Sequence, residues 1–125
     1  LQGIGGQKAF RVVHAKLQFN RAIVLMQQDQ NAEAIPALLE TVAVFPNHLR
    51  AHASLGFIFS NSDKFYEQAK HHLMRAIDLQ TDPDLVGGLL ERLEFVEKLH
   101  RLALERKQLD GESEPDSSEP PVPTN

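Results

Sequence analysis

Two tandem copies of one unit make up most of this chain, and this repeat constrains its fold more than any other feature. When Arg21-Ala22 is aligned with Leu55-Gly56, Leu25 falls on Phe59. One inserted residue in the second copy then aligns three further pairs, which are Ala34 with Ala69, Leu38 with Leu73, and Thr41 with Ala76. The units span 15–48 and 49–83, of 34 and 35 residues, and follow one another without a linker. Units of this kind bury their apolar faces by stacking on one another.

The spacing of the apolar residues predicts that the units are helical. Apolar side chains recur at three- and four-residue steps, and no window shows the alternation typical of a strand. Polar turns, Pro46 and Asp82-Pro83 mark the breaks between segments. The pattern predicts an all-α chain with helices over about 7–28, from after Asn31 to before Pro46, over about 48–60 and 65–79, and from Pro83 to about 108. The first is either one long helix or two helices broken near His14.

A helix–turn–helix unit of about 34 residues, with small residues where its helices cross, resembles the tetratricopeptide repeat. Small residues let paired helices approach closely, while larger ones fill the space between them. The second copy matches the signature of that family through Leu55-Gly56, Phe59, Ala69, Leu73 and Ala76, and the first copy through Ala22, Leu25, Ala34, Leu38 and Pro46. The resemblance covers about 69 of the 125 residues and implies an α-solenoid that binds other proteins.

The chain departs from the family pattern at several positions. Gln18 and His52 stand where an aromatic residue is usual early in the first helix of each repeat. Arg21 replaces a usual leucine, and Thr81 stands where the second copy would have its proline. Pro36 lies inside the second helix and removes one hydrogen bond, so we expect that helix to begin late or to bend.

The helical domain is predicted to span 7–108, and the sequence on either side of it differs in character. Residues 1–6 hold three glycines and are expected to form a flexible lead-in. Residues 109–125 form an acidic, Pro- and Ser-rich tail that is predicted to be disordered, because it has too few apolar side chains to offset the entropy of ordering. Because residue 1 is Leu rather than Met, we expect the chain to be a segment of a longer protein. Two repeats alone leave end surfaces exposed, so we expect further repeats upstream.

The last predicted helix, over 83–108, is expected to cap the repeat array. Its carboxylates lie among basic side chains, which is typical of a solvated helix face rather than of a catalytic pair. Glu94–Lys98 and Glu97–Arg101 have the spacing of stabilising pairs on that face. The apolar stripe that would face the array runs through Leu85, Leu89, Leu93, Val96, either Leu99 or His100, and Ala103.

Charge and hydropathy exclude several classes of function. Five of the 17 acidic residues lie in the last sixteen positions, so 12 acids against 13 bases leave the helical body near neutral. A near-neutral body has no basic stripe for a phosphate backbone, and no nucleic-acid partner is expected. The apolar runs are too short to span a bilayer, so no membrane insertion is expected either. With no secretory or transit signal in view, we expect a cytoplasmic location.

No motif for catalysis or metal binding is present. The chain has no cysteine, which excludes disulfides, thiolate zinc sites and a thiol nucleophile. His48 and His52 have the i,i+4 spacing of zinc ligands, but Leu49 stands where the HExxH pattern requires Glu, so surface and helix-packing histidines are the favoured interpretation. We therefore expect no enzymatic activity, no metal or cofactor and no small-molecule substrate.

The resemblance places the partner-binding surface in the concave groove that the first helix of each repeat lines. Phe19, Ile23, Met26 and Phe57 would form an apolar strip with basic ends there, suited to an amphipathic helix or an extended apolar peptide. Because apolar residues stand where co-chaperone members hold a terminal carboxylate, no carboxylate clamp is expected. The predicted groove residues are Lys16, Phe19, Ile23, Met26, Gln27, Arg50, Ala53, Phe57, Ser60 and Asn61.

Three functional hypotheses remain open at this point. The first is an interaction module that binds a protein or peptide in the groove. The second is a structural end cap, whose apolar groove is covered by an adjacent repeat of the same protein or by its own tail. The third, by analogy with the family alone, is a targeting module attached to a catalytic domain elsewhere in the parent chain.

Overall fold

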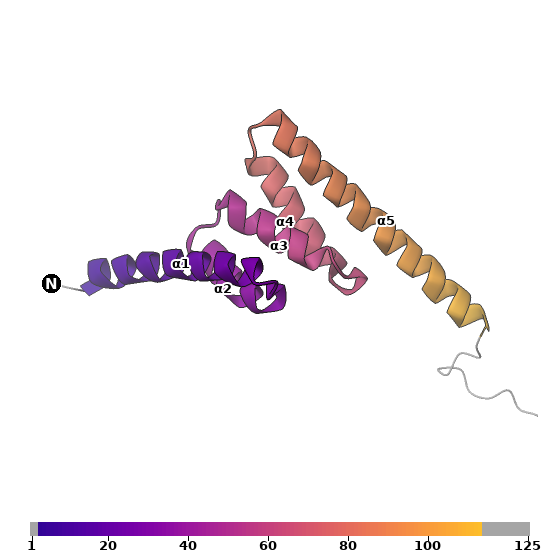
Figure 1. Cartoon of the computed structure of the whole chain (residues 1–125), viewed down its shortest axis with the longest axis horizontal. Coiled ribbons are helices and arrows are strands. Elements are labelled where there is room, and N and C mark those ends of the chain that lie inside the picture. The colour runs from indigo at the N-terminus through magenta and orange to yellow at the C-terminus, as the bar shows by residue number, and fades with distance from the viewer. Residues whose placement is uncertain (1–2, 114–125) are drawn as a thin grey trace, which may run out of the picture.

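A computed structural model of the chain describes residues 3–113, and this part is all-α. The five helices predicted from apolar spacing are confirmed, and a short 3-10 helix precedes the fourth (Figure 1). The elements are α1 (Gly3–Gln27), α2 (Asn31–Val44), α3 (Leu49–Phe59), η1 (Asp63–Phe65), α4 (Tyr66–Leu79) and α5 (Pro83–Ser113). No helix in the described range is long and apolar enough to cross a membrane.

The helices pack mainly against their neighbours in sequence. Helices α1 and α2 form one hairpin and α3 and α4 form a second, while α2 packs on α3 and α4 packs on α5. Figure 1 shows the two hairpins side by side, with α5 lying along the second hairpin and running past it. The arrangement leaves one long side of α1 and one long side of α5 without a neighbouring helix.

The positions that align between the two sequence copies are the positions that form the core. Ala22 and Gly56 are both buried, as are Thr41 and Ala76 at the other end of the alignment. Two first-copy positions are exceptions: Leu25 is only partly buried while its counterpart Phe59 is buried, and Arg21 is exposed while its counterpart Leu55 is buried. The remaining aligned pairs are fully buried: Ala34 with Ala69, and Leu38 with Leu73.

Gly56 sets the distance between α3 and α4. A Cβ atom at this position would lie 2.7 Å from both Cγ and Cδ2 of Leu73 and 3.2 Å from its backbone nitrogen. Leu73 is itself fully buried, so it has no space into which to retreat. The close approach of the second hairpin therefore requires glycine at position 56.

Helix boundaries differ from the predicted ones at both ends of the chain. Helix α1 begins at Gly3 rather than at residue 7 and is unbroken at His14, while α5 ends at Ser113 rather than at about 108. Glycines weaken a helix without terminating it, and no proline interrupts 108–113, so the helices continue. The predicted lead-in and tail were therefore too long, and residues 1–2 and 114–125 lie outside the described range.

Pro36 lies within α2, which begins at Asn31. The prediction that this helix would begin late is wrong. A proline at this position deprives the carbonyl of Ala32 of its helical donor. Both Ala32 and Pro36 are exposed, so that carbonyl is open to solvent rather than left unpaired in the core.

The outer side of α5 is more apolar than the polar capping face predicted from the sequence. Of the predicted stripe, Leu89 and Val96 are buried against the second hairpin, Leu93 and Ala103 are partly buried, and Leu85 is exposed, contrary to the prediction. The ambiguity between Leu99 and His100 is settled by a stacking contact, because the His100 ring lies 3.8 Å from the ring of Tyr66. Several large apolar side chains remain exposed along the helix: Leu85, Leu90, Phe95, Leu102, Leu104 and Leu109.

Candidate functional site

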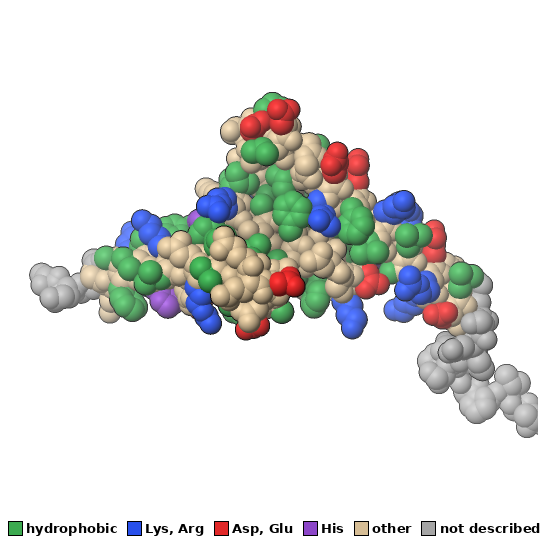
Figure 2. Space-filling model, in the orientation of Figure 1, with side chains coloured by type: hydrophobic (Ala, Val, Ile, Leu, Met, Phe, Trp, Pro, Cys, Tyr) green, Lys and Arg blue, Asp and Glu red, His purple; other side chains and the backbone are tan. Residues whose placement is uncertain are grey.

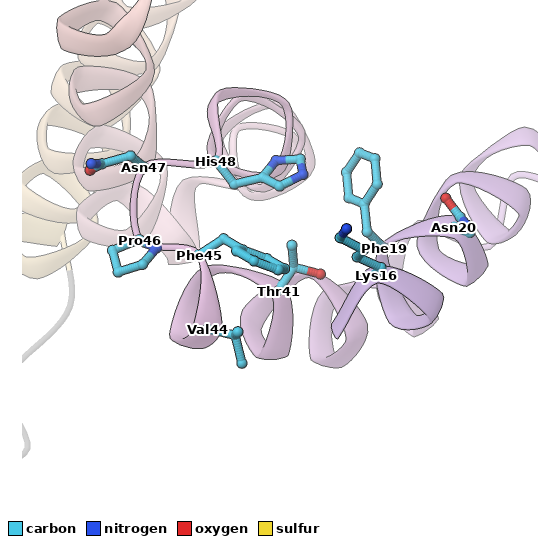
Figure 3. A pocket seen from close by; sticks show the side chains of 9 residues that line it. All are labelled: Lys16, Phe19, Asn20, Thr41, Val44, Phe45, Pro46, Asn47 and His48. Atoms are coloured by element: carbon cyan, nitrogen blue, oxygen red, sulfur yellow. The ribbon is translucent and has the colours of Figure 1, made fainter. Parts of the chain in front are cut away.

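A first pocket lies between the first hairpin and the turn that leads to the second. Its volume is about 660 Å³. Figure 3 shows the side chains of Lys16 and Phe19 on α1 facing the turn that carries His48. No acidic residue lines this pocket. The lining residues are Lys16, Phe19, Asn20, Thr41, Val44, Phe45, Pro46, Asn47 and His48.

Aromatic contacts hold the wall of this first pocket together. The rings of Phe19 and His48 lie with their centroids 4.4 Å apart, and His48 is also 6.3 Å from the ring of Phe45. Phe19 is only 8% exposed and belongs to the hydrophobic core. It therefore forms a fixed wall of the pocket rather than a free contact for a partner.

His48 has a structural role at the start of α3. Its Nδ1 accepts a hydrogen bond of 3.1 Å from the backbone N–H of Ala51, which caps the helix. Burial lowers the pKa of His48 below its ordinary value, with smaller effects of the same sign from Arg50 and His52. The neutral imidazole is therefore favoured, with its proton on Nε2.

A second pocket lies between α3 and the beginning of α5. It has a volume of about 310 Å³, and its lining is largely apolar, with Arg50 and Asp84 as the charged members. Phe57, Ala53 and Leu49 contribute the α3 side of the pocket. The α5 side and the end of α4 supply the remaining residues, Gln80, Asp84, Leu85, Gly88 and Leu89.

A third, shallower pocket continues from the second along α5. It has a volume of about 370 Å³ and shares Phe57 and Gly88 with the second pocket. The guanidinium of Arg92 lies 5.1 Å from the ring centroid of Phe57 and 5.3 Å from that of Phe95, so it stacks between two aromatic rings. Figure 2 shows the hydrophobic side chains gathered over the centre of this face, with basic groups among them.

Two side chains link neighbouring pockets. Arg50 lines the second pocket, and its guanidinium lies 5.2 Å from the ring centroid of Phe19 in the first. Phe57 lines both the second and the third pocket. We call this row of three pockets, from Phe19 through Arg50 and Phe57 to Arg92, the α1/α3/α5 groove.

The structure brings only some of the predicted groove residues together. Lys16 and Phe19 line the first pocket, and Arg50, Ala53 and Phe57 line the second. Ile23 and Met26 are partly buried against the core, and Gln27 and Asn61 are exposed but line none of these three pockets.

Ser60 does not belong to the groove surface. It is buried, and its hydroxyl donates a hydrogen bond of 2.7 Å to the backbone carbonyl of Phe57. The predicted role of Ser60 in partner binding is therefore wrong. It follows α3 at the position where the helix ends, so its hydroxyl satisfies a terminal carbonyl instead of facing a partner.

A chain of hydrogen bonds through two buried histidines ties the turn of the first pocket to α4. His52 Nε2 lies 2.8 Å from the carbonyl oxygen of Pro46, and since a carbonyl only accepts, this nitrogen carries a proton. His52 Nδ1 is then an acceptor, and it lies 3.0 Å from Nδ1 of His72, which donates. The chain therefore runs from His72 through His52 to Pro46.

Burial keeps both histidines neutral. It lowers the pKa of His72 to about 4, with further lowering by the neighbouring His71 and His52. It also lowers the pKa of His52, against a smaller opposing effect of the hydrogen bond to Pro46. The i,i+4 pair of His48 and His52 is not a metal pair here, since their contacts lie with Ala51, Pro46 and His72. Within residues 3–113 no group of three or more His, Cys, Asp or Glu could hold a metal ion.

The sequence did not indicate the second wall of the groove. Leu85, Gly88 and Arg92 come from α5, and Val44 and Phe45 from the end of α2. These residues line pockets because of how the hairpins meet, and no local spacing encodes that geometry.

Comparison with protein-family models, with curated proteins and with solved structures finds no match for this chain.

Proposed function

We propose that this chain is a non-enzymatic protein-interaction module of the tetratricopeptide-repeat kind, and that the α1/α3/α5 groove binds a peptide or helix of another protein. The observation that carries the proposal is the row of three neighbouring pockets, in which Phe57 lines both the second and the third and Arg50 of the second contacts Phe19 of the first. A row of pockets fits an extended ligand that places successive side chains in successive pockets. The two helical hairpins, with core positions that repeat between them, support the family resemblance.

The chemistry of the groove indicates the kind of ligand that it would take. Apolar side chains supply most of the second pocket, and rings form one wall of the first. Lys16, Arg50 and Arg92 lie beside these apolar surfaces. A segment with two or three apolar anchors, separated by polar or acidic residues, satisfies both features. Binding energy would come mainly from the buried anchors.

Selection from a random peptide library displayed against the folded chain tests the proposal. We expect enrichment of peptides with spaced apolar residues, and binding of a selected synthetic peptide to weaken about tenfold or more with Phe57→Ser, as for an interface anchor. Leu39→Ser is the matched control, because Leu39 is 42% exposed and Phe57 37%, but Leu39 lies on α2 outside the three pockets. Failure to enrich any peptide, or equal binding by both variants, would overturn the proposal.

A second candidate function is that of a structural unit in a longer helical array, and one observation favours it. Helix α1 has a second apolar face about 180° around from its buried face, since Phe10, Val13, Leu17 and Val24 follow helical spacing. All four are exposed. In an array this stripe would pack against one more helical hairpin, as the buried face of α1 packs on α2.

Addition of one helical hairpin tests this second candidate. The α3–η1–α4 segment, duplicated and fused before α1, would raise the midpoint of thermal unfolding if the stripe accepts a neighbouring hairpin. Val13→Glu in the fused protein should remove that gain, whereas the same substitution in the unfused chain should change stability little, because Val13 is exposed there. A fused protein that melts in two independent transitions would contradict the array role.

A further inference from the structure

The distal part of α5 carries a regular apolar seam. Phe95, Leu102 and Leu109 are spaced seven residues apart, with Leu99 and Arg106 four residues after the first two. This alternation of four- and three-residue steps is the heptad pattern of helices that pair through knobs-into-holes packing. Three of the apolar members are exposed and Leu99 is partly exposed.

The seam lies on a different side of α5 from the face that packs on the second hairpin. Phe95, Leu102 and Leu109 lie about 130° around α5 from Leu89 and Val96, which are buried against the second hairpin. The stacking of His100 on Tyr66 fixes this rotation of the helix. Figure 1 shows that α5 runs past the hairpins, which leaves its length accessible to a second helix.

An antiparallel arrangement makes the seam complementary to itself. Placing Leu99 opposite Leu102 of a second copy sets Phe95 opposite Arg106 and Arg92 opposite Leu109, with each contact occurring twice. The Phe95 ring already stacks on Arg92 of its own chain at 5.3 Å. Its other face would receive the Arg106 guanidinium of the second copy, a favourable cation–π contact. The apolar pair at the centre is leucine on leucine.

The charges that flank the seam favour the same register. Lys98 and Glu105 occupy equivalent flanking positions of successive heptads, and both are exposed. In the antiparallel register Lys98 of one copy lies beside Glu105 of the other, so two opposite-charge pairs form. A parallel pair would instead place Arg106 beside Arg106 and Glu105 beside Asp110, which are like charges. Charge therefore selects the antiparallel orientation.

We propose that this protein self-associates through an antiparallel α5–α5 pair centred between Leu99 and Leu102. The contact shares Arg92 and Phe95 with the third pocket of the α1/α3/α5 groove, but its centre at Leu99 and Leu102 lies outside all three pockets. With a seam of about two heptads, the dimer is weak and forms in the micromolar to millimolar range.

Sedimentation equilibrium of the full chain over this concentration range tests the proposal. We expect a reversible monomer–dimer equilibrium, and Leu102→Glu should raise its dissociation constant at least about tenfold, since it places charges at the centre of the pair. Leu104→Glu is the control, because Leu104 is 53% exposed and Leu102 47%, but the two lie about 200° apart on α5. A chain that stays monomeric throughout, or variants that behave alike, would overturn the proposal.

Two further measurements test the antiparallel orientation of the α5–α5 pair. Lys98→Glu should weaken the dimer, and adding Glu105→Lys should restore it, because the pair is then reversed but still opposite in charge. The chain has no natural cysteine, so single substitutions report position cleanly. Oxidation should link a Leu99→Cys chain to a Leu102→Cys chain faster than it links either variant to itself. Faster linkage between identical variants would indicate a parallel pair and contradict the register.

Discussion

His72 donates a hydrogen bond from Nδ1 to Nδ1 of His52 over 3.0 Å, between α4 and α3. The same His52 ring donates from Nε2 to the carbonyl of Pro46, in the turn that joins the two hairpins. Both rings are buried. This chain of bonds needs His52 neutral, because a doubly protonated His52 would have no acceptor for His72, and burial favours the neutral form of His72. The packing of the second hairpin and the wall of the first pocket therefore depend on the protonation of the same two side chains.

The free energy of unfolding should fall as the solution becomes acidic. The pKa of His72 is about 4 in the folded chain and near 6.5 when unfolded, so the unfolded chain takes up protons first as pH decreases. Stability is then complete above about pH 6.5 and declines towards pH 4, and His72 alone accounts for about 2 kcal/mol between pH 7 and pH 5. Urea unfolding followed by circular dichroism measures this. A flat profile over that range would show that the two rings are not kept neutral.

Replacing His72 should both destabilise the protein and reduce this pH dependence. His72→Leu leaves Nδ1 of His52 without a donor inside the core, at a cost of about 1–3 kcal/mol at neutral pH. The variant also lacks the His72 imidazole, whose lowered pKa is the source of the expected pH dependence. His71→Leu is the control, because His71 is the exposed neighbour on the same helix. Equal stability and equal pH dependence in the two variants would refute the hydrogen-bonded chain.

Gly56 and Gly87 should respond in opposite directions to the same substitution. Gly56→Ala introduces a Cβ that overlaps Leu73, and we expect a loss of about 1–3 kcal/mol from overpacking. Gly87 lies in α5, and a Cβ added there would meet nothing within 4 Å, so Gly87→Ala should stabilise the helix by about 0.4–1 kcal/mol. Chemical denaturation of both variants checks this. A Gly56→Ala variant that loses no stability would argue against the close crossing of α3 and α4.

The single tyrosine of the chain reports the attachment of α5 to the second hairpin. Tyr66 donates a hydrogen bond of 2.7 Å to a carboxylate oxygen of Glu97, and this bond is the main cause of a raised Tyr66 pKa. Spectrophotometric titration should show ionisation above the ordinary pKa of about 10. Glu97→Gln should bring it back towards that value, whereas Glu94→Gln should not. An ordinary pKa in the unmodified chain would mean that α5 is not held in this way.

Much of the fold was predictable, because helical spacing and repeated small residues are local signals. The alignment of Ala34 with Ala69 and of Leu38 with Leu73 identified core positions correctly. The outer side of α5 was less predictable, since choosing between Leu99 and His100 required knowing where Tyr66 lies. The Glu97–Arg101 spacing suggested a pair within α5, yet Glu97 contacts Tyr66 and lies 3.8 Å from Lys70 on α4.

The groove could be predicted only in part from the sequence. Lys16, Arg50 and Phe57 line pockets, because the exposed side of the first helix in a hairpin follows from its helical register, whereas Phe19 lines its pocket from the edge of the core. Ser60 was misassigned, since capping bonds at the end of a helix depend on backbone geometry. The contribution of α5 arises from contacts between segments distant in sequence. The resemblance to tetratricopeptide repeats stays a prediction.

Mapping of a bound peptide by NMR tests the central claim most directly. A peptide selected on the folded chain should shift the amide resonances of Phe19, Arg50, Phe57 and Arg92 as one continuous set with one affinity, while those of Leu39 and Met74 stay unchanged. Such a result would locate binding in the α1/α3/α5 groove. Shifts confined to the outer stripe of α1, or the absence of any saturable shift in the groove, would contradict the account.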